Sequence, residues 1–235
     1  MKMLKLFLRS SGRGEMVERI RLSHDGSGIR ENGNWDADTI RRRVPTREIG
    51  KRKIILLLRD PRDVMVSFYF QATKRRGAFE GGIGEFIRSP LWGVDRFVAF
   101  YDAYLAHLEG KREGVDYILA RYEDLHADCP GTLRRVLDFL GVDDADDDIL
   151  DDAIERASFD NMRREEEKRV LEMGGVFRGA DIDDPESFKT RKGKVGAYAE
   201  YLRPEDVERI TSAVAKSPRL MDALGWRGKD GAPWT

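Results

Sequence analysis

An apolar run that passes through a charged turn into an amphipathic segment constrains the fold of this chain more than any other feature. Ile54–Leu58 has the length and the unbroken apolar character of a buried parallel strand. Pro61 stands where a helix would begin, and its fixed φ and missing N–H suit the first helical position. The segment therefore predicts the strand, turn and helix of an open α/β sheet.

Two polar side chains of this segment are candidates for ligand binding. Arg59 leaves the carboxyl end of the predicted strand, and Ser67 lies within the predicted helix. Ligands of open α/β sheets bind at the carboxyl ends of strands, and a guanidinium with a hydroxyl suits a phosphate. The alternative is that Arg59 only pairs with Asp60 or Asp63, because such segments occur in many α/β folds of different function.

Length, charge and cysteine content limit the class of protein. A chain of 235 residues is long enough for one well-buried α/β domain, which we place over residues 1–235. Its formal net charge of −1 gives no global attraction to nucleic acid or membrane, and we expect no membrane span. A single cysteine, Cys129, excludes an internal disulfide and fits a reducing compartment. We expect a soluble, cytoplasmic protein.

Other segments predict strands and helices in alternation. A second buried strand is expected over Asp116–Tyr122, and a short strand over Glu18–Ser23. Residues 171–197, which contain five glycines, predict a long loop. Helices are predicted over residues 1–9, 91–108, 133–140, 154–170 (with a break near Ser158) and 204–216. This order indicates a central parallel sheet flanked by helices.

An acidic run between two predicted helices has a structural interpretation. Asp143–Asp152 holds seven aspartates. Acidic residues favour the first turn of a helix, so we expect a solvated helix start there and no metal site.

Several motifs occur in a fixed order along the chain, after His24 and the strand-turn-helix segment. They are Tyr122-Glu123-Asp124-Leu125, Leu137-Asp138-Phe139-Leu140-Gly141, Ala157-Ser158-Phe159-Asp160-Asn161-Met162 and Arg191-Lys192-Gly193-Lys194-Val195-Gly196. Together they resemble the cytosolic-type sulfotransferases over roughly residues 15–215. The resemblance implies a three-layer P-loop-type α/β domain. It also implies sulfonyl transfer from 3′-phosphoadenosine 5′-phosphosulfate (PAPS) to a hydroxyl or amine, without a metal.

The resemblance implies a site for the 3′-phosphate of the nucleotide. Arg59 and Ser67 match the family's strand-helix motif, and Arg191, Lys192 and Gly193 match its late loop motif. Two cations beside a glycine make a good anion site. Taken alone, however, Arg191-Lys192 would be interpreted as an exposed basic patch.

The resemblance also implies contacts to the adenosine. Tyr122 matches a tyrosine near the nucleoside, and Phe159 matches an aromatic that stacks on the adenine. The family often has threonine where Ala157 stands, so a hydrogen bond to the base is expected to be lost unless Ser158 supplies it.

His24 matches the family's catalytic base. Its imidazole would take the proton from the acceptor hydroxyl as that oxygen attacks sulfur, which suits a group that titrates near neutral pH. His107 and His126 have no such motif around them and are assigned no role.

One part of the family pattern is missing. The family opens with a strand and a lysine-containing phosphate loop, whereas residues 1–9 resemble the tail of the following helix. Ser10–Gly14 follows a helix rather than a strand, so we do not accept it as a replacement. We therefore expect an N-terminally truncated chain; the alternative is a diverged member without the loop.

Other functions stay open at this stage. A pseudoenzyme would keep only the 3′-phosphate half-site. A nucleic-acid module would use Arg41-Arg42-Arg43, Lys51 and Lys53, but the net charge near zero and the absence of interleaved aromatics count against it. A nucleotide kinase would need a phosphate loop and magnesium ligands that we do not find. The sequence favours no one acceptor class among small molecules, glycans and lipids, and a homodimer stays an open alternative. Six aromatic residues are candidates for the wall of the acceptor pocket, but we favour them as core: Phe68, Tyr69, Phe70, Phe79, Phe86 and Trp92.

Overall fold

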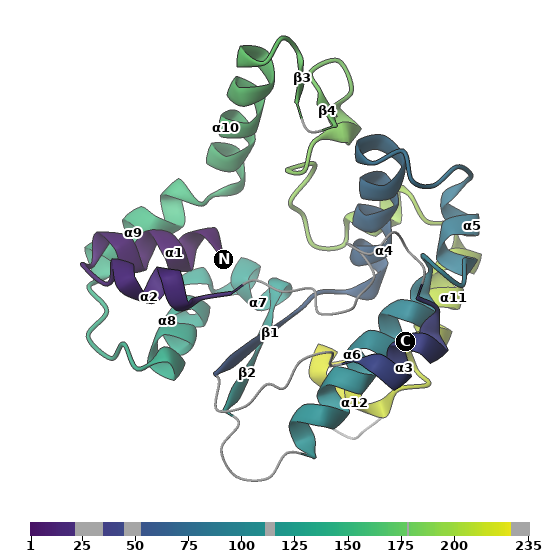
Figure 1. Cartoon of the computed structure of the whole chain (residues 1–235), viewed down its shortest axis with the longest axis horizontal. Coiled ribbons are helices and arrows are strands. Elements are labelled where there is room, and N and C mark those ends of the chain that lie inside the picture. The colour runs from purple at the N-terminus through teal and green to yellow at the C-terminus, as the bar shows by residue number, and fades with distance from the viewer. Residues whose placement is uncertain (22–34, 45–52, 111–115, 178, 227–235) are drawn as a thin grey trace. The chain divides into compact units, whose positions relative to one another are not determined.

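The computed structural model describes residues 1–21, 35–44, 53–110, 116–177 and 179–226 (Figure 1). Its contacts divide the chain into two compact units. The first consists of Met1–Ser23, Phe70–Gly77 and Glu123–Lys194, and the second of His24–Tyr69, Ala78–Tyr122 and Val195–Thr235. That residues 1–235 form one functional domain stays a prediction.

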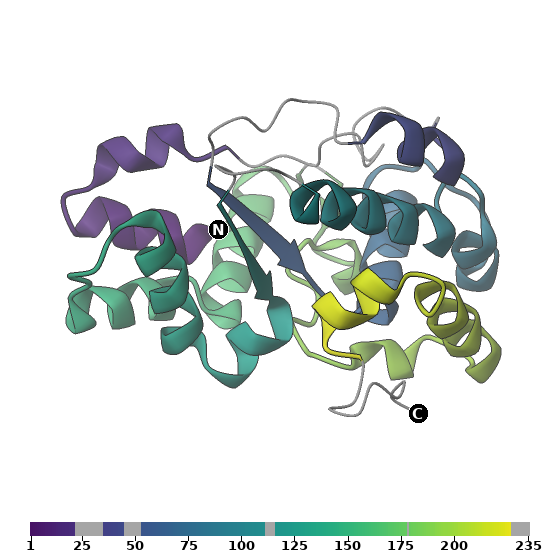
Figure 2. The same ribbon diagram turned by 90° about the horizontal axis from the view of Figure 1, so that it is seen from below.

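The second unit is built on a parallel pair of strands. β1 (Ile54–Leu58) pairs with β2 (Tyr117–Arg121) in a register that runs from Ile54 opposite Tyr117 to Leu58 opposite Arg121. Figure 2 shows the two arrows side by side and pointing the same way. Parallel strands need a long crossover, which the helices between β1 and β2 provide. The predicted α/β class with parallel strands is therefore confirmed.

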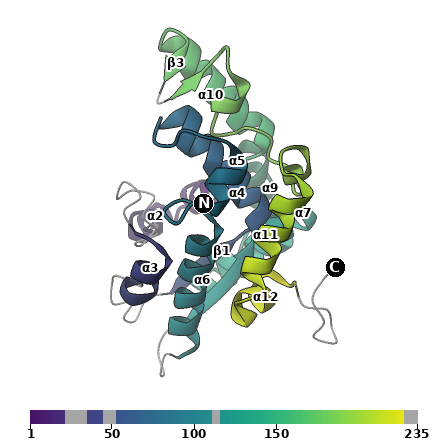
Figure 3. The same ribbon diagram turned by 90° about the vertical axis from the view of Figure 1, so that its right-hand side faces the viewer.

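Helices make up most of the rest of the second unit. α4 (Pro61–Phe70) begins at the predicted proline, and α5 (Ile83–Arg88) and α6 (Val94–Glu109) complete the crossover. α3 (Ala37–Arg43), α11 (Pro204–Val214) and α12 (Pro218–Leu224) all contact α6. Figure 3 shows α6 flanked by α3 and α12. The 3₁₀ turn η3 (Ala197–Glu200) precedes α11.

The first unit is mostly helical. It contains α1 (Lys2–Ser10), α2 (Gly14–Arg19), α8 (Cys129–Leu140), α9 (Asp147–Arg156) and α10 (Phe159–Glu172). α7 (Tyr122–Ala127) begins directly after β2. α1 packs on α2 and α9, with Phe7 and Leu8 fully buried. A π-helix, η1 (Gln71–Arg75), continues α4.

Two helices of the first unit begin at aspartate caps. Asp128 caps α8, and Gly141 ends it in the left-handed conformation that glycine adopts without strain. Asp146 caps α9 by accepting from the Ile149 N–H, so the acidic run is a helix start as predicted.

Three expectations are wrong in detail. Glu18–Ser23 is not a strand from its start, because α2 extends to Arg19 and buries Val17. Residues 171–197 are not a plain loop: β3 (Val176–Phe177), β4 (Ala180–Asp181) and the 3₁₀ turn η2 (Pro185–Ser187) form within them. β1 is buried on only one face, since successive strand residues point to opposite faces and Leu57 is 50% exposed.

An aromatic cluster forms part of the core of the second unit. Phe86 is fully buried and contacts the rings of Phe68, Tyr69, Phe79 and Trp92 at centroid distances of 5.1–6.1 Å. Edge-to-face pairs of this kind add to the free energy gained by burial. In this structure these residues are packing elements.

Phe86→Ala should lower the free energy of unfolding by about 3–5 kcal/mol, because it removes a fully buried ring at the centre of this cluster. Denaturant unfolding measures the change. Leu171→Ala, at a site that is 60% exposed on α10, is the control and should change stability by no more than about 0.5 kcal/mol. A similar small loss for both variants would contradict the assignment of Phe86 to the core.

Candidate functional site

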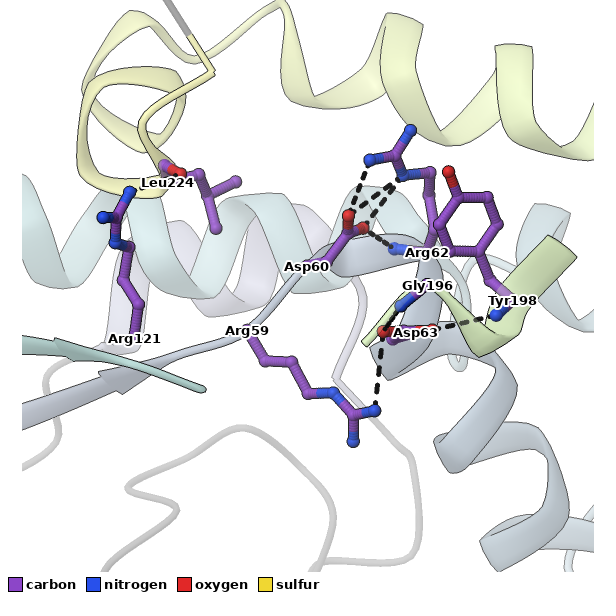
Figure 4. Close-up of polar contacts among 8 residues, drawn as sticks. All are labelled: Arg59, Asp60, Arg62, Asp63, Arg121, Gly196, Tyr198 and Leu224. Carbon is purple, nitrogen blue, oxygen red and sulfur yellow. Dashed lines mark hydrogen bonds and ion pairs between the residues drawn. The ribbon is translucent and has the colours of Figure 1, made fainter. Parts of the chain in front are cut away.

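The start of α4 carries a cluster of charged side chains just after β1. Asp60 accepts the Arg62 N–H at 2.8 Å and holds the Arg62 guanidinium through both carboxylate oxygens, at 2.6–3.2 Å (Figure 4). That guanidinium also lies over the rings of Tyr198 and Trp226, at 4.4 and 4.7 Å. Burial opposes the charge of Arg62, but the bond to Asp60 outweighs it and raises the pKa of Arg62. Arg62 therefore anchors η3, through Tyr198, and the residues just after α12, through Trp226, to α4.

Asp63 is the buried centre of a second network. Its side chain is 1% exposed and accepts the backbone N–H groups of Gly196 and Tyr198, each at 2.9 Å. Its Oδ2 also lies 3.5 Å from Nη2 of Arg59 (Figure 4). The ion pair considered from sequence thus exists with Asp63, whereas Asp60 pairs with Arg62. The role of Asp63 in holding residues 196–198 was missed, because nothing local signals contacts 133 and 135 positions away.

Two of the predicted site residues meet at the carboxyl ends of the strands. The β1–β2 register places Leu58 opposite Arg121, so the residues that follow them, Arg59 and Tyr122, come together. The Arg59 guanidinium lies 4.2 Å from the centre of the Tyr122 ring. With Asp63 at its edge and Tyr122 at its face, Arg59 is held in one orientation. Ser67 is an exposed residue of α4 in the same unit.

Two more predicted residues meet within the first unit. Gly193 has a φ of +62°, and a Cβ at this position would overlap the ring of Phe159. Phe159 is the first residue of α10, and the oxygen of Ser158 accepts the Asn161 N–H as the helix cap. The loop therefore lies against Phe159 only because residue 193 is a glycine.

Arg191 is also held on two sides within this unit. Its Nη1 lies 3.0 Å from Oε2 of Glu186, and its guanidinium lies 4.5 Å from the centre of the Phe70 ring. Its side chain is 12% exposed, so Arg191 is not part of an open basic patch. Lys192 beside it is half-buried. His24, the predicted base, lies outside the described residues.

The described part of the chain contains neither a candidate membrane span nor a candidate metal cluster. None of its helices is long and apolar enough to cross a membrane. Within the same residues, no group of three or more histidine, cysteine, aspartate or glutamate side chains is arranged to hold a metal ion.

Comparison with known proteins identifies the family. The sulfotransferase domain model matches residues 48–225, which include all the predicted site residues except His24. Curated relatives include mouse sulfotransferase 2A1, 31% identical over 67% of this chain and 53% of its own length. Cytosolic sulfotransferase 10 of Arabidopsis thaliana is 30% identical over 67% of this chain and 47% of its own length. The chain belongs to the cytosolic-type sulfotransferase family, and it spans about half the length of these relatives.

Solved structures show the same fold. A retinol dehydratase in complex with androsterone and the inactive cofactor PAP has a TM-score of 0.54 at 21% identity, covering 76% of this chain and 50% of its own. A mouse sulfotransferase complexed with PAP has a TM-score of 0.51 at 17% identity, covering 77% and 62%.

Gly193→Ala should destabilise the protein more than Gly196→Ala, by about 1 kcal/mol or more. Both glycines have positive φ, so both substitutions carry the backbone cost, but only the methyl group at 193 meets a ring, while that at 196 enters open space. Denaturant unfolding of the two variants measures the difference. Equal losses would contradict the packing of Gly193 on Phe159.

Proposed function

We propose that this chain is a sulfotransferase of the PAPS-dependent type, which transfers a sulfonyl group to a hydroxyl or amine of an acceptor. The observation that carries the proposal is the meeting of Arg59 and Tyr122 at the carboxyl ends of β1 and β2, within a chain that matches the sulfotransferase domain. Two solved structures of the same fold are complexed with PAP, which supports the same class of nucleotide here. The names of plant relatives support a cytoplasmic location.

In this proposal two groups of side chains bind the nucleotide. Arg59 and Ser67, and Arg191 and Lys192 with the Gly193 backbone, would bind the 3′-phosphate. The support is chemical, because guanidinium groups give charge-assisted hydrogen bonds to phosphate oxygens. Both arginines are already oriented by a carboxylate and an aromatic ring, which lowers the entropy lost when they bind a ligand.

Aromatic residues would complete the nucleotide site. Phe159 would stack on the adenine, and Tyr122 would lie near the nucleoside. The packing of Gly193 on Phe159 supports a common role for the late loop and this ring. The Ser158 hydroxyl caps α10, so it would contact the base only while keeping that role.

His24 would act as the general base. It takes the proton of the acceptor hydroxyl as the oxygen attacks sulfur, and the bond between sulfur and the phosphate oxygen breaks, leaving adenosine 3′,5′-bisphosphate. The Arg59 and Arg191 side chains would hold the nucleotide in place while its 5′ end reacts.

Arg59→Ala and Arg191→Ala should each weaken the binding of adenosine 3′,5′-bisphosphate by roughly 10–100-fold, because each removes charged hydrogen bonds to the 3′-phosphate. Isothermal titration calorimetry measures the dissociation constant. Adenosine 5′-monophosphate, which lacks that phosphate, should bind the unaltered chain more weakly.

Arg203→Ala is the matched control, since this arginine is 79% exposed and pairs only loosely with Glu205, at 3.7 Å. It should leave affinity unchanged. A folded chain that binds the two nucleotides equally, or alanine variants at 59 and 191 that bind like the control, would overturn the proposed phosphate site.

His24→Ala should lower the rate of sulfonyl transfer by about 10²–10⁴-fold and leave the affinity for adenosine 3′,5′-bisphosphate unchanged, as expected of a base that does not bind the nucleotide. The assay uses PAPS with a phenol, an aliphatic alcohol and an amine as acceptors. His126→Ala is the control. Binding without turnover in the unaltered chain would favour a pseudoenzyme, and an active His24 variant would remove the base assignment.

A further inference from the structure

A single carboxylate holds the chain just before the late loop. Glu166, on α10, accepts the Lys189 N–H at 2.9 Å through Oε1, and the Thr190 N–H at 2.9 Å and hydroxyl at 2.5 Å through Oε2. These bonds join positions 23 and 24 residues apart and end immediately before Arg191. Both carboxylate oxygens of Glu166 therefore accept hydrogen bonds from residues 189–190.

The π-helix η1 also contacts Glu166, through Arg75. Arg75 of η1 pairs with Oε1 of Glu166 at 3.3 Å, and both side chains are mostly buried. Lys74 of the same turn pairs with Asp184 at 2.9 Å, and a Cβ on Gly179 would overlap the Arg75 backbone. The π-helix thus packs closely against the segment that leads to the late loop, and such turns are frequent at functional sites.

A second side chain of α10, that of Arg163, also contacts Thr190. Arg163 donates to the Thr190 carbonyl at 3.0 Å, and its guanidinium lies 3.6 Å from the centre of the Phe188 ring. Thr190 is therefore fixed through its N–H, its hydroxyl and its carbonyl. The residue that follows, Arg191, begins from a backbone position with little freedom.

We propose that Glu166 is a positioning residue that fixes the loop Arg191–Gly193 in the form that binds the 3′-phosphate. This inference rests on the proposed function. Burial opposes the charge of Glu166, but its bonds to Thr190 and Lys189 and the charge of Arg75 outweigh burial and lower its pKa, so the carboxylate is charged near neutral pH. Without it the three donors lose their acceptor, and the loop gains freedom that nucleotide binding must remove again.

Thr190 provides a test that leaves the net charge unchanged. Thr190→Val keeps the shape of the side chain but removes the hydroxyl donor, whereas Thr190→Ser keeps the donor. In the full chain, Thr190→Val and Glu166→Gln should weaken the binding of adenosine 3′,5′-bisphosphate by about threefold or more, as expected for the loss of a hydrogen bond. Thr190→Ser should bind within about twofold of the unaltered chain. Isothermal titration calorimetry measures each value.

Hydrogen exchange of the nucleotide-free protein separates positioning from folding. Exchange at residues 189–193 should rise in Thr190→Val and Glu166→Gln, while exchange along α10 stays unchanged. Glu165→Gln, the same substitution one position earlier, is the control, because Glu165 pairs with Lys2 at 2.9 Å and not with the loop.

The outcomes separate the two proposals. If the unaltered chain binds the bisphosphate but the Thr190→Val and Glu166→Gln variants match Glu165→Gln, the role of Glu166 is overturned while the phosphate site stands. The role is also overturned if Thr190→Ser fails to restore affinity or if exchange rises along all of α10. If the unaltered chain does not prefer the bisphosphate to the monophosphate, the phosphate site itself fails, and the role of Glu166 with it.

Discussion

The second unit depends on a buried carboxylate that must be compensated. Asp63 is 1% exposed, and a charged group at such a position is tolerated only when hydrogen bonds and opposite charge surround it. Two backbone N–H groups and Arg59 provide that compensation. As a result, the start of α4, the arginine after β1 and residues 196–198 are fixed to one another. Removing any one of these partners would leave a buried polar group without a hydrogen bond, which lowers the free energy of unfolding.

The parallel register carries this arrangement into the proposed site. Because β1 and β2 end at the same level, the residues that follow them are neighbours whatever their separation in sequence. Arg59 and Tyr122 meet for this reason, and the stacking between them needs no further element to place it. The strand pair thus determines where the Arg59 side chain lies, and its ion pair with Asp63 determines how the guanidinium is oriented. Both are needed before a guanidinium can form directed bonds to a phosphate.

Sequence reasoning predicted the local elements well where chemistry marked their ends. Ile54–Leu58 is bounded by charge and Pro61 begins α4, so the limits of that strand and the start of that helix were predicted correctly. The strand predicted over Glu18–Ser23 does not start at Glu18, because a short alternation does not outweigh the burial of Val17 in α2, and its last two residues lie outside the described residues. The hydrogen-bond partners of the site residues were harder to predict. Asp63 contacts Gly196, and Glu166 contacts Thr190, only because the tertiary fold brings distant segments together, and no local sequence pattern indicates such contacts.

Arginines held by a ring and a carboxylate recur in this chain, so the motif alone does not identify a ligand site. Arg59, Arg62, Arg163 and Arg191 each lie over an aromatic ring and pair with an acidic side chain. Arg62 joins three segments of its unit, and Arg163 holds the carbonyl of Thr190, so these two have structural tasks that account for their contacts. What distinguishes Arg59 and Arg191 is their place, one at the carboxyl end of a parallel strand and the other in a loop whose glycine packs on Phe159. In each case the acidic partner and the ring orient the guanidinium, and a fixed orientation is what directed, charge-assisted hydrogen bonds to a phosphate require.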